Sequence, residues 1–200
     1  MLWHAIRAVC VPGVESVFVV LAPDDSLFER QDWSAFAGRL APLYCGGASR
    51  RDSVYNGLVA TSSDLEADDW MLVHDAARPC LAAQDLQNLV RECEGDAIGG
   101  LLALPAADTV KQAAKDEAGT MRVAATLDRA QLWLAQTPQM FRAGLLAQAL
   151  RSAPRGVTDE ASAVEALGLK PRLVAGSRDN LKVTYPEDFA VAESILARRA

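Results

Sequence analysis

The chain has 200 residues, of which 50% are hydrophobic and 23% charged, with a formal net charge of −6. This apolar fraction can bury one sizeable core and argues against disorder, and the negative charge argues against nucleic acid or an anionic membrane as partner. No apolar run reaches membrane-spanning length. The four cysteines (10, 45, 80 and 93) lack metal-type spacing, so we expect reduced thiols and a cytoplasmic protein.

Helices and strands alternate through the first half of the chain. We expect an amphipathic helix at the N-terminus, strands at 16–22, 41–45, 70–74 and 97–104, and helices at 27–40, 54–61 and 82–93. This βαβ spacing predicts an α/β fold, which we expect to form one domain over residues 1–200.

The pattern of polar and apolar residues changes after Thr109. Two short polar stretches, 110–114 and 120–125, flank a turn at 115–119 there. They predict a β-hairpin. Because a two-stranded ribbon is barely stable alone, a second subunit is its natural packing partner. Beyond it we expect helices at 143–151 and after Thr158-Asp159-Glu160, strands at 170–175 and 180–184, and a final helix opened by Pro186.

The stretch Trp70-Met71-Leu72-Val73-His74-Asp75-Ala76-Ala77-Arg78-Pro79 ends an apolar strand in a polar loop. In α/β sheets, ligands bind outside the carboxyl ends of the strands. There Asp75 can be an oxygen ligand for Mg²⁺, and Arg78 can bind a phosphate through two hydrogen bonds. The alternative is a charged turn with an Asp–Arg ion pair.

A second candidate site lies in Gly46-Gly47-Ala48-Ser49-Arg50-Arg51-Asp52-Ser53, before the helix at 54–61. The first turn of a helix has N–H groups without helical partners, and these can receive an anion. The alternative is a flexible turn with solvated arginines.

These two stretches and five others occur together in order. The others are Asp108-Thr109-Val110-Lys111, Asp128-Arg129, Gln136-Thr137-Pro138-Gln139, Thr158-Asp159-Glu160-Ala161-Ser162 and Asn180-Leu181-Lys182-Val183-Thr184. In order and spacing the chain resembles the 2-C-methyl-D-erythritol 4-phosphate cytidylyltransferases over essentially its whole length.

The resemblance implies an enzyme of isoprenoid precursor synthesis that joins CTP to methylerythritol phosphate and releases pyrophosphate. It implies a doubly wound, Rossmann-like mixed sheet, a homodimer embraced by a β-arm at about 109–126, and Mg²⁺ or another divalent cation. Such a transfer requires positioning and charge neutralisation but no covalent nucleophile.

The resemblance also implies a role for each matching residue. Asp75 binds the metal, and Lys182 lies beside the reacting phosphates, so these two are the catalytic candidates. The nucleotide contacts are Gly47, Arg50, Ser53, Asp75 and Ala76. The methylerythritol phosphate contacts are Arg78, Thr109, Lys182, and Arg129 with Thr137 from the partner subunit.

Two further expectations concern residues outside that set. We expect His74 to pack or hydrogen-bond rather than act as a base, and Thr158–Glu160 mainly to cap a helix. The family begins with a strand and a glycine-rich loop that have no counterpart here, so we expect the natural polypeptide to extend upstream of Met1.

Two alternative functions remain open from the sequence. A ribitol-5-phosphate cytidylyltransferase would use much the same scaffold and nucleotide site. A non-catalytic nucleotide-binding or dimerisation protein would explain the missing loop, but it has no need of Asp75 together with Arg78, Arg129 and Lys182.

Overall fold

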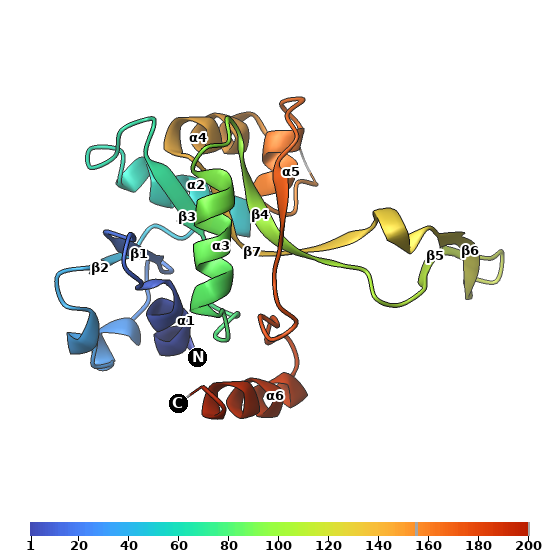
Figure 1. Cartoon of the computed structure of the whole chain (residues 1–200), viewed down its shortest axis with the longest axis horizontal. Helices are drawn as coiled ribbons and strands as arrows, with labels where there is room; N and C mark the ends of the chain where they lie inside the picture. Colours follow the sequence, from blue (N-terminus) through green and yellow to red (C-terminus); the bar gives the residue numbers. More distant parts are fainter. Residues whose placement is uncertain (155, 200) are drawn as a thin grey trace.

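A four-stranded mixed sheet lies in the main body of the molecule (Figure 1). The computed structural model describes residues 1–154 and 156–199. The strand order is β3-β7-β4-β8, in which β7 runs antiparallel to β3 and β4, and β8 runs parallel to β4. The strands are β3 (Trp70–Val73), β4 (Gly99–Pro105), β7 (Trp133–Arg142) and β8 (Arg172–Ala175).

A separate parallel pair is formed by β1 (Val17–Val20) and β2 (Leu40–Leu43). The expected mixed α/β architecture is therefore confirmed. Within the described residues, however, the strands are divided among three hydrogen-bonded sheets rather than joined in one.

Neighbouring residues of a strand point to opposite faces of the sheet. In the four-stranded sheet both faces carry apolar side chains, and helices cover both. Leu101 and Phe141 pack in one apolar cluster with α2, α4 and α5, whereas Leu102 and Met140 pack in the other with α1 and α3. The helices are α1 (Leu2–Val9), α2 (Arg50–Ala60), α3 (Ala83–Cys93), α4 (Ala143–Ser152), α5 (Glu160–Glu165) and α6 (Pro186–Ala197).

The helix predicted over 27–40 is wrong. The segment forms two short 3-10 turns, η1 (Phe28–Arg30) and η2 (Ser34–Phe36). Asp25 accepts the N–H groups of Leu27 and Phe28, and Asp32 accepts that of Ser34. Such local side-chain hydrogen bonds compete with the helical pattern.

The predicted hairpin is confirmed as β5 (Val110–Lys115) paired with β6 (Met121–Leu127). It projects from the main body, connected by two long segments (Figure 1). Met121 and Val123 are more than half exposed on it. Its predicted role as a dimerisation arm stays a prediction.

Among the described residues, no helix combines the length and apolar character needed to cross a membrane.

Candidate active site

The loop that follows β3 begins with His74 and carries Asp75 and Arg78. Its backbone makes a tight turn, in which the N–H of Arg78 donates to the carbonyl of Asp75 over 2.9 Å. The loop is also held from outside, since the N–H of Asp75 donates to Oγ1 of Thr137 on β7 over 3.0 Å. Because β7 pairs with β3, its residue 137 lies beside the end of that strand.

Three cationic side chains surround the Asp75 carboxylate. Arg50 Nε lies 2.9 Å from Oδ1, while Lys182 Nζ lies 3.2 Å and Arg78 Nε 4.0 Å from Oδ2. The Asp75 side chain is only 13% exposed, so solvent screens these attractions weakly. Burial raises the pKa of Asp75, but Arg50 and Lys182 outweigh burial and hold the pKa below its usual range.

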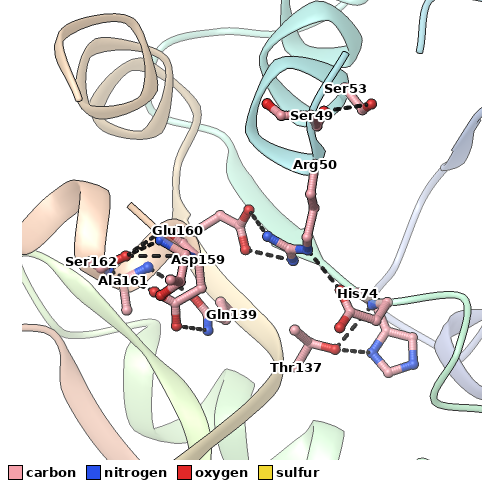
Figure 2. Close-up of polar contacts among 12 residues, drawn as sticks. Ser49, Arg50, Ser53, His74, Thr137, Gln139, Asp159, Glu160, Ala161 and Ser162 are labelled. Atoms are coloured by element: carbon pink, nitrogen blue, oxygen red, sulfur yellow. Dashed lines mark hydrogen bonds and ion pairs between the residues drawn. The ribbon is translucent and has the colours of Figure 1, made fainter. Parts of the chain in front are cut away.

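Arg50 joins Asp75 to a second carboxylate, Glu160. Its two terminal nitrogens donate to Glu160 Oε1 and Oε2 over 2.6 and 2.9 Å. Figure 2 shows Arg50 reaching from the start of α2 toward Glu160, with Thr137 and His74 beyond its other side. A planar guanidinium suits this double contact, and its Nε remains directed at Asp75.

Glu160 is the first residue of α5 and is completely buried. Burial raises its pKa even though the hydrogen bonds from Arg50 lower it. For Arg50, desolvation alone lowers the pKa, but hydrogen bonding and attraction by Glu160 and Asp75 raise it above its usual value. The cluster of Asp75, Glu160, Arg50, Arg78 and Lys182 therefore holds three cations and two carboxylates.

The sequence predicts mainly a capping role for Thr158–Glu160. The cap is confirmed, since Asp159 and Ser162 form a reciprocal capping box. The contact of Glu160 with Arg50 was missed, because the two residues are 110 positions apart in the chain.

The glycine-containing turn before α2 is compact. Ser49 caps the helix by accepting the N–H of Asp52, and the N–H of Gly47 donates to Oγ of Ser53 over 3.0 Å. A Cβ on Gly47 would stand 2.5 Å from Cβ of Asp52, so no other residue fits there without displacing the turn. Gly47 and Ser53 therefore lie in the same turn as Arg50, as the sequence predicted.

Arg78 is held by the segment that carries Lys182. Its terminal nitrogen donates to the carbonyl of Asn180 over 2.6 Å, and the N–H of Val183 donates to the carbonyl of Ala77 over 2.8 Å. The strand predicted at 180–184 is wrong, because these residues form a loop bound to the β3 loop instead of a ladder. The Arg78 side chain is only 12% exposed, and its buried Nε has no hydrogen-bond partner within the described part of the chain.

The predicted site residues fall into two groups. One group lies around the C-terminal end of β3, the middle of β7 and the start of α2, and it consists of Gly47, Arg50, Ser53, Asp75, Ala76, Arg78, Thr137 and Lys182. The other group consists of Thr109 and Arg129, which are exposed and flank the β5–β6 arm.

The expectation that Thr137 acts from the partner subunit needs correction. Its hydroxyl is bonded to Asp75 and His74 of its own chain, and the residue is buried. Arg129 instead donates to the carbonyl of Ala107, near Thr109, at the base of the arm. Thr137 therefore belongs to the Asp75 site of the same chain.

Almost the whole chain is similar to proteins of one family. The family model described as 2-C-methyl-D-erythritol 4-phosphate cytidylyltransferase matches residues 1–198. A relative of that name from Azoarcus sp. (strain BH72) is 53% identical over all of this chain and 83% of its own length. One from Nitrosomonas eutropha is 51% identical over all of this chain and 85% of its own.

Solved structures agree with these sequence matches. The crystal structure of a 4-diphosphocytidyl-2C-methyl-D-erythritol synthase is 37% identical, with a TM-score of 0.86 over 98% of this chain and 89% of that one. The Francisella tularensis 2-C-methyl-D-erythritol 4-phosphate cytidylyltransferase is 33% identical, with a TM-score of 0.80 over 97% and 87% of the two chains.

Proposed function

We propose, since the chain belongs to the 2-C-methyl-D-erythritol 4-phosphate cytidylyltransferase family, that the Asp75 cluster is the site of this family's reaction. The enzyme transfers the cytidylyl group of CTP to 2-C-methyl-D-erythritol 4-phosphate in isoprenoid precursor synthesis. The products are pyrophosphate and 4-diphosphocytidyl-2-C-methyl-D-erythritol. The family match favours neither the ribitol phosphate alternative nor the non-catalytic one.

The observation that carries the proposal is the meeting of three cations around Asp75. Arg50, Arg78 and Lys182 come from separate segments and converge on one carboxylate. The reaction brings the phosphate of one substrate against the α-phosphate of the other, so two anions must approach. Cations held in advance lower the cost of that approach and stabilise the charge that develops on the transferred phosphate.

We propose Mg²⁺ as the metal, with Asp75 as its protein ligand. Among the described residues, no three His, Cys, Asp or Glu side chains form a metal cluster. A single carboxylate together with substrate phosphates fits the usual coordination of Mg²⁺ in nucleotide sites. When bound, the metal neutralises triphosphate charge and orients the α-phosphate.

The contacts of Asp75 indicate which cation would give way to the metal. Arg50 is anchored by two hydrogen bonds to Glu160, whereas the Lys182 side chain is 48% exposed. Lys182 can therefore turn from Oδ2 toward the reacting phosphates while Arg50 stays in place. Asp75 would therefore contact one fixed cation, Arg50, and one movable cation, Lys182.

The other residues near Asp75 are assigned to a substrate by where they lie relative to that carboxylate. We propose that the turn of Gly47, Arg50 and Ser53 and the nearby Ala76 contact the nucleotide. Arg78, Thr137 and Lys182 would face methylerythritol phosphate from the same chain. The buried Nε of Arg78, which lacks a hydrogen-bond partner among described residues, suits a phosphate donor.

Thr109 and Arg129 lie at the arm, away from this cluster, so we propose that they act on the partner's site in a homodimer. The arm exposes Met121 and Val123, which a second subunit would cover. We also propose a cytoplasmic location, which suits the free thiols of all four cysteines.

Substitution of Asp75 tests the site. In Asp75→Asn the amide is uncharged, so we expect turnover to fall by at least about 10²-fold and the dependence on Mg²⁺ to weaken. Pyrophosphate release from CTP and methylerythritol phosphate measures both effects. Asp64→Asn is a matched control, because Asp64 is exposed and follows the C-terminal end of α2, the opposite end of that helix from Arg50. Normal activity of Asp75→Asn would remove Asp75 from the site.

A further inference from the structure

Both ring nitrogens of His74 make hydrogen bonds. Nε2 lies 3.0 Å from the carbonyl oxygen of Arg78, and Nδ1 lies 3.2 Å from Oγ1 of Thr137. A carbonyl oxygen can only accept, so Nε2 carries the proton of a neutral ring. Nδ1 is then an acceptor, and the Thr137 hydroxyl must donate its proton to it.

This assignment gives the hydrogen bonds one direction. The N–H of Asp75 donates to Thr137 over 3.0 Å, Thr137 donates to His74, and His74 donates to the carbonyl of Arg78. The single proton of the Thr137 hydroxyl is therefore used in the hydrogen bond to His74. Toward any other group Thr137 offers only a lone pair, which suits a hydroxyl of a polyol rather than a phosphate oxygen.

The same ring also joins the two ends of the loop that carries Asp75 and Arg78. Through Thr137 it holds the start of the loop, and through the Arg78 carbonyl it holds the end. A protonated ring would have no acceptor for Thr137.

We propose that His74 is a positioning residue, which fixes the direction of the Thr137 hydroxyl and so the placement of the Asp75 loop. This inference rests on the proposed function, because it assumes that Asp75 and Thr137 act in the site. It goes beyond a packing role, since it assigns His74 one tautomer and Thr137 one hydrogen-bonding capacity.

Two substitutions separate the ring nitrogens. The Asn side chain places an acceptor near the position of Nδ1, whereas Gln places a donor near the position of Nε2. We expect His74→Gln to lower kcat/KM about three- to tenfold, the effect of one lost hydrogen bond. We expect His74→Asn, which keeps an acceptor for Thr137, to lower it less.

A double-mutant cycle with Thr137→Val tests whether the effect passes through the hydroxyl. In the Thr137→Val background, His74→Gln should cause little further loss of kcat/KM. A loss of the same factor in both backgrounds would overturn the proposal. Equal melting temperatures of His74→Asn and His74→Gln, beside unequal kcat/KM, would support orientation over general stability.

The tautomer can be measured without activity. The chain has two histidines, so His4→Asn leaves the ring of His74 as the only imidazole signal. A two-bond ¹H–¹⁵N correlation spectrum at neutral pH should show a neutral ring protonated at Nε2, with Nδ1 shifting in Thr137→Val. A proton on Nδ1, or a charged ring, would overturn the proposal. An inactive Asp75→Asn alongside that result would leave the proposed function standing.

Discussion

Arg50 contacts two carboxylates that differ in their exposure to solvent. Glu160 is completely buried, and Asp75 opens to the proposed substrate site. Because the buried carboxylate takes two of the guanidinium hydrogen bonds, Arg50 is oriented before any substrate arrives. We infer that Glu160 acts on the site only through Arg50.

Substitution of Arg50 should show how much the buried charge of Glu160 destabilises the fold when it has no cation beside it. Arg50→Met leaves a buried carboxylate without its cation, so we expect the free energy of unfolding to fall by about 3–5 kcal/mol. Arg50→Met combined with Glu160→Gln should recover much of that loss, because the amide carries no charge. Urea unfolding at neutral pH measures both. If the second substitution recovers nothing, burial of the charge is not the cause.

The pKa of His74 predicts a pH dependence of stability. The folded state lowers the pKa to about 4 from the ordinary 6.5. Between these values the unfolded chain binds a proton that the folded chain does not. The free energy of unfolding should therefore fall as the pH is lowered through this window, by at most about 1.4 kcal/mol per pH unit from this group.

Thermal unfolding of wild type and His74→Asn checks this dependence. His4 is present in both proteins, so the difference between them isolates His74. The advantage of the wild type should shrink as the pH is lowered from about 6.5 to 4. A difference that stays constant over this window would contradict a His74 ring that stays neutral in the folded state.

At the residue scale, the sequence predicted Asp75, Arg78 and Lys182 correctly as neighbours. A strand end is a local pattern, and the ordered motifs added the distant lysine. The Glu160 contact could not be predicted in the same way, because an ion pair between two helix starts leaves no periodic pattern. The nearest signal was an acidic residue next to the cap Asp159.

The turn between β2 and α2 shows how an element depends on one small residue. The added Cβ of Gly47→Ala would meet the Asp52 side chain at 2.5 Å, so the turn must shift. We expect the KM for CTP to rise at least several-fold, because this turn carries Ser53 and Arg50. Gly95→Ala is the control, since a Cβ there meets nothing within 4 Å. Equal KM values in the two variants would show that the turn does not bind the nucleotide.

Prediction of the elements succeeded where apolar periodicity was strong, as in α3, and failed where polar side chains bonded to the backbone. Asp25 and Asp32 turn the chain in the segment predicted as a helix. In the segment predicted as a strand, the buried Asn180 donates to the carbonyl of Thr137 and so binds β7 as a loop. Both failures result from side-chain hydrogen bonds that a hydropathy pattern does not contain.

At the scale of the whole molecule, the arm remains without apolar cover. Its strands contact each other but leave Met121, Val123 and Leu127 exposed. Arg129, at the base of the same arm, lies outside the Asp75 cluster although the resemblance implies that it binds substrate. The proposed homodimer, in which each arm would reach the other subunit's site, would account for the exposed apolar residues and for the position of Arg129.

In the proposed homodimer, Lys182 of one chain and Arg129 of its partner would complete one active site. Pyrophosphate release from an equal mixture of Arg129→Ala and Lys182→Ala subunits, each inactive alone, tests it most directly. After subunit exchange, half of the dimers are mixed and each has one intact site, so activity should return to about a quarter of wild type. No recovery, with exchange demonstrated, would contradict the shared site and place Arg129 in its own chain's reaction.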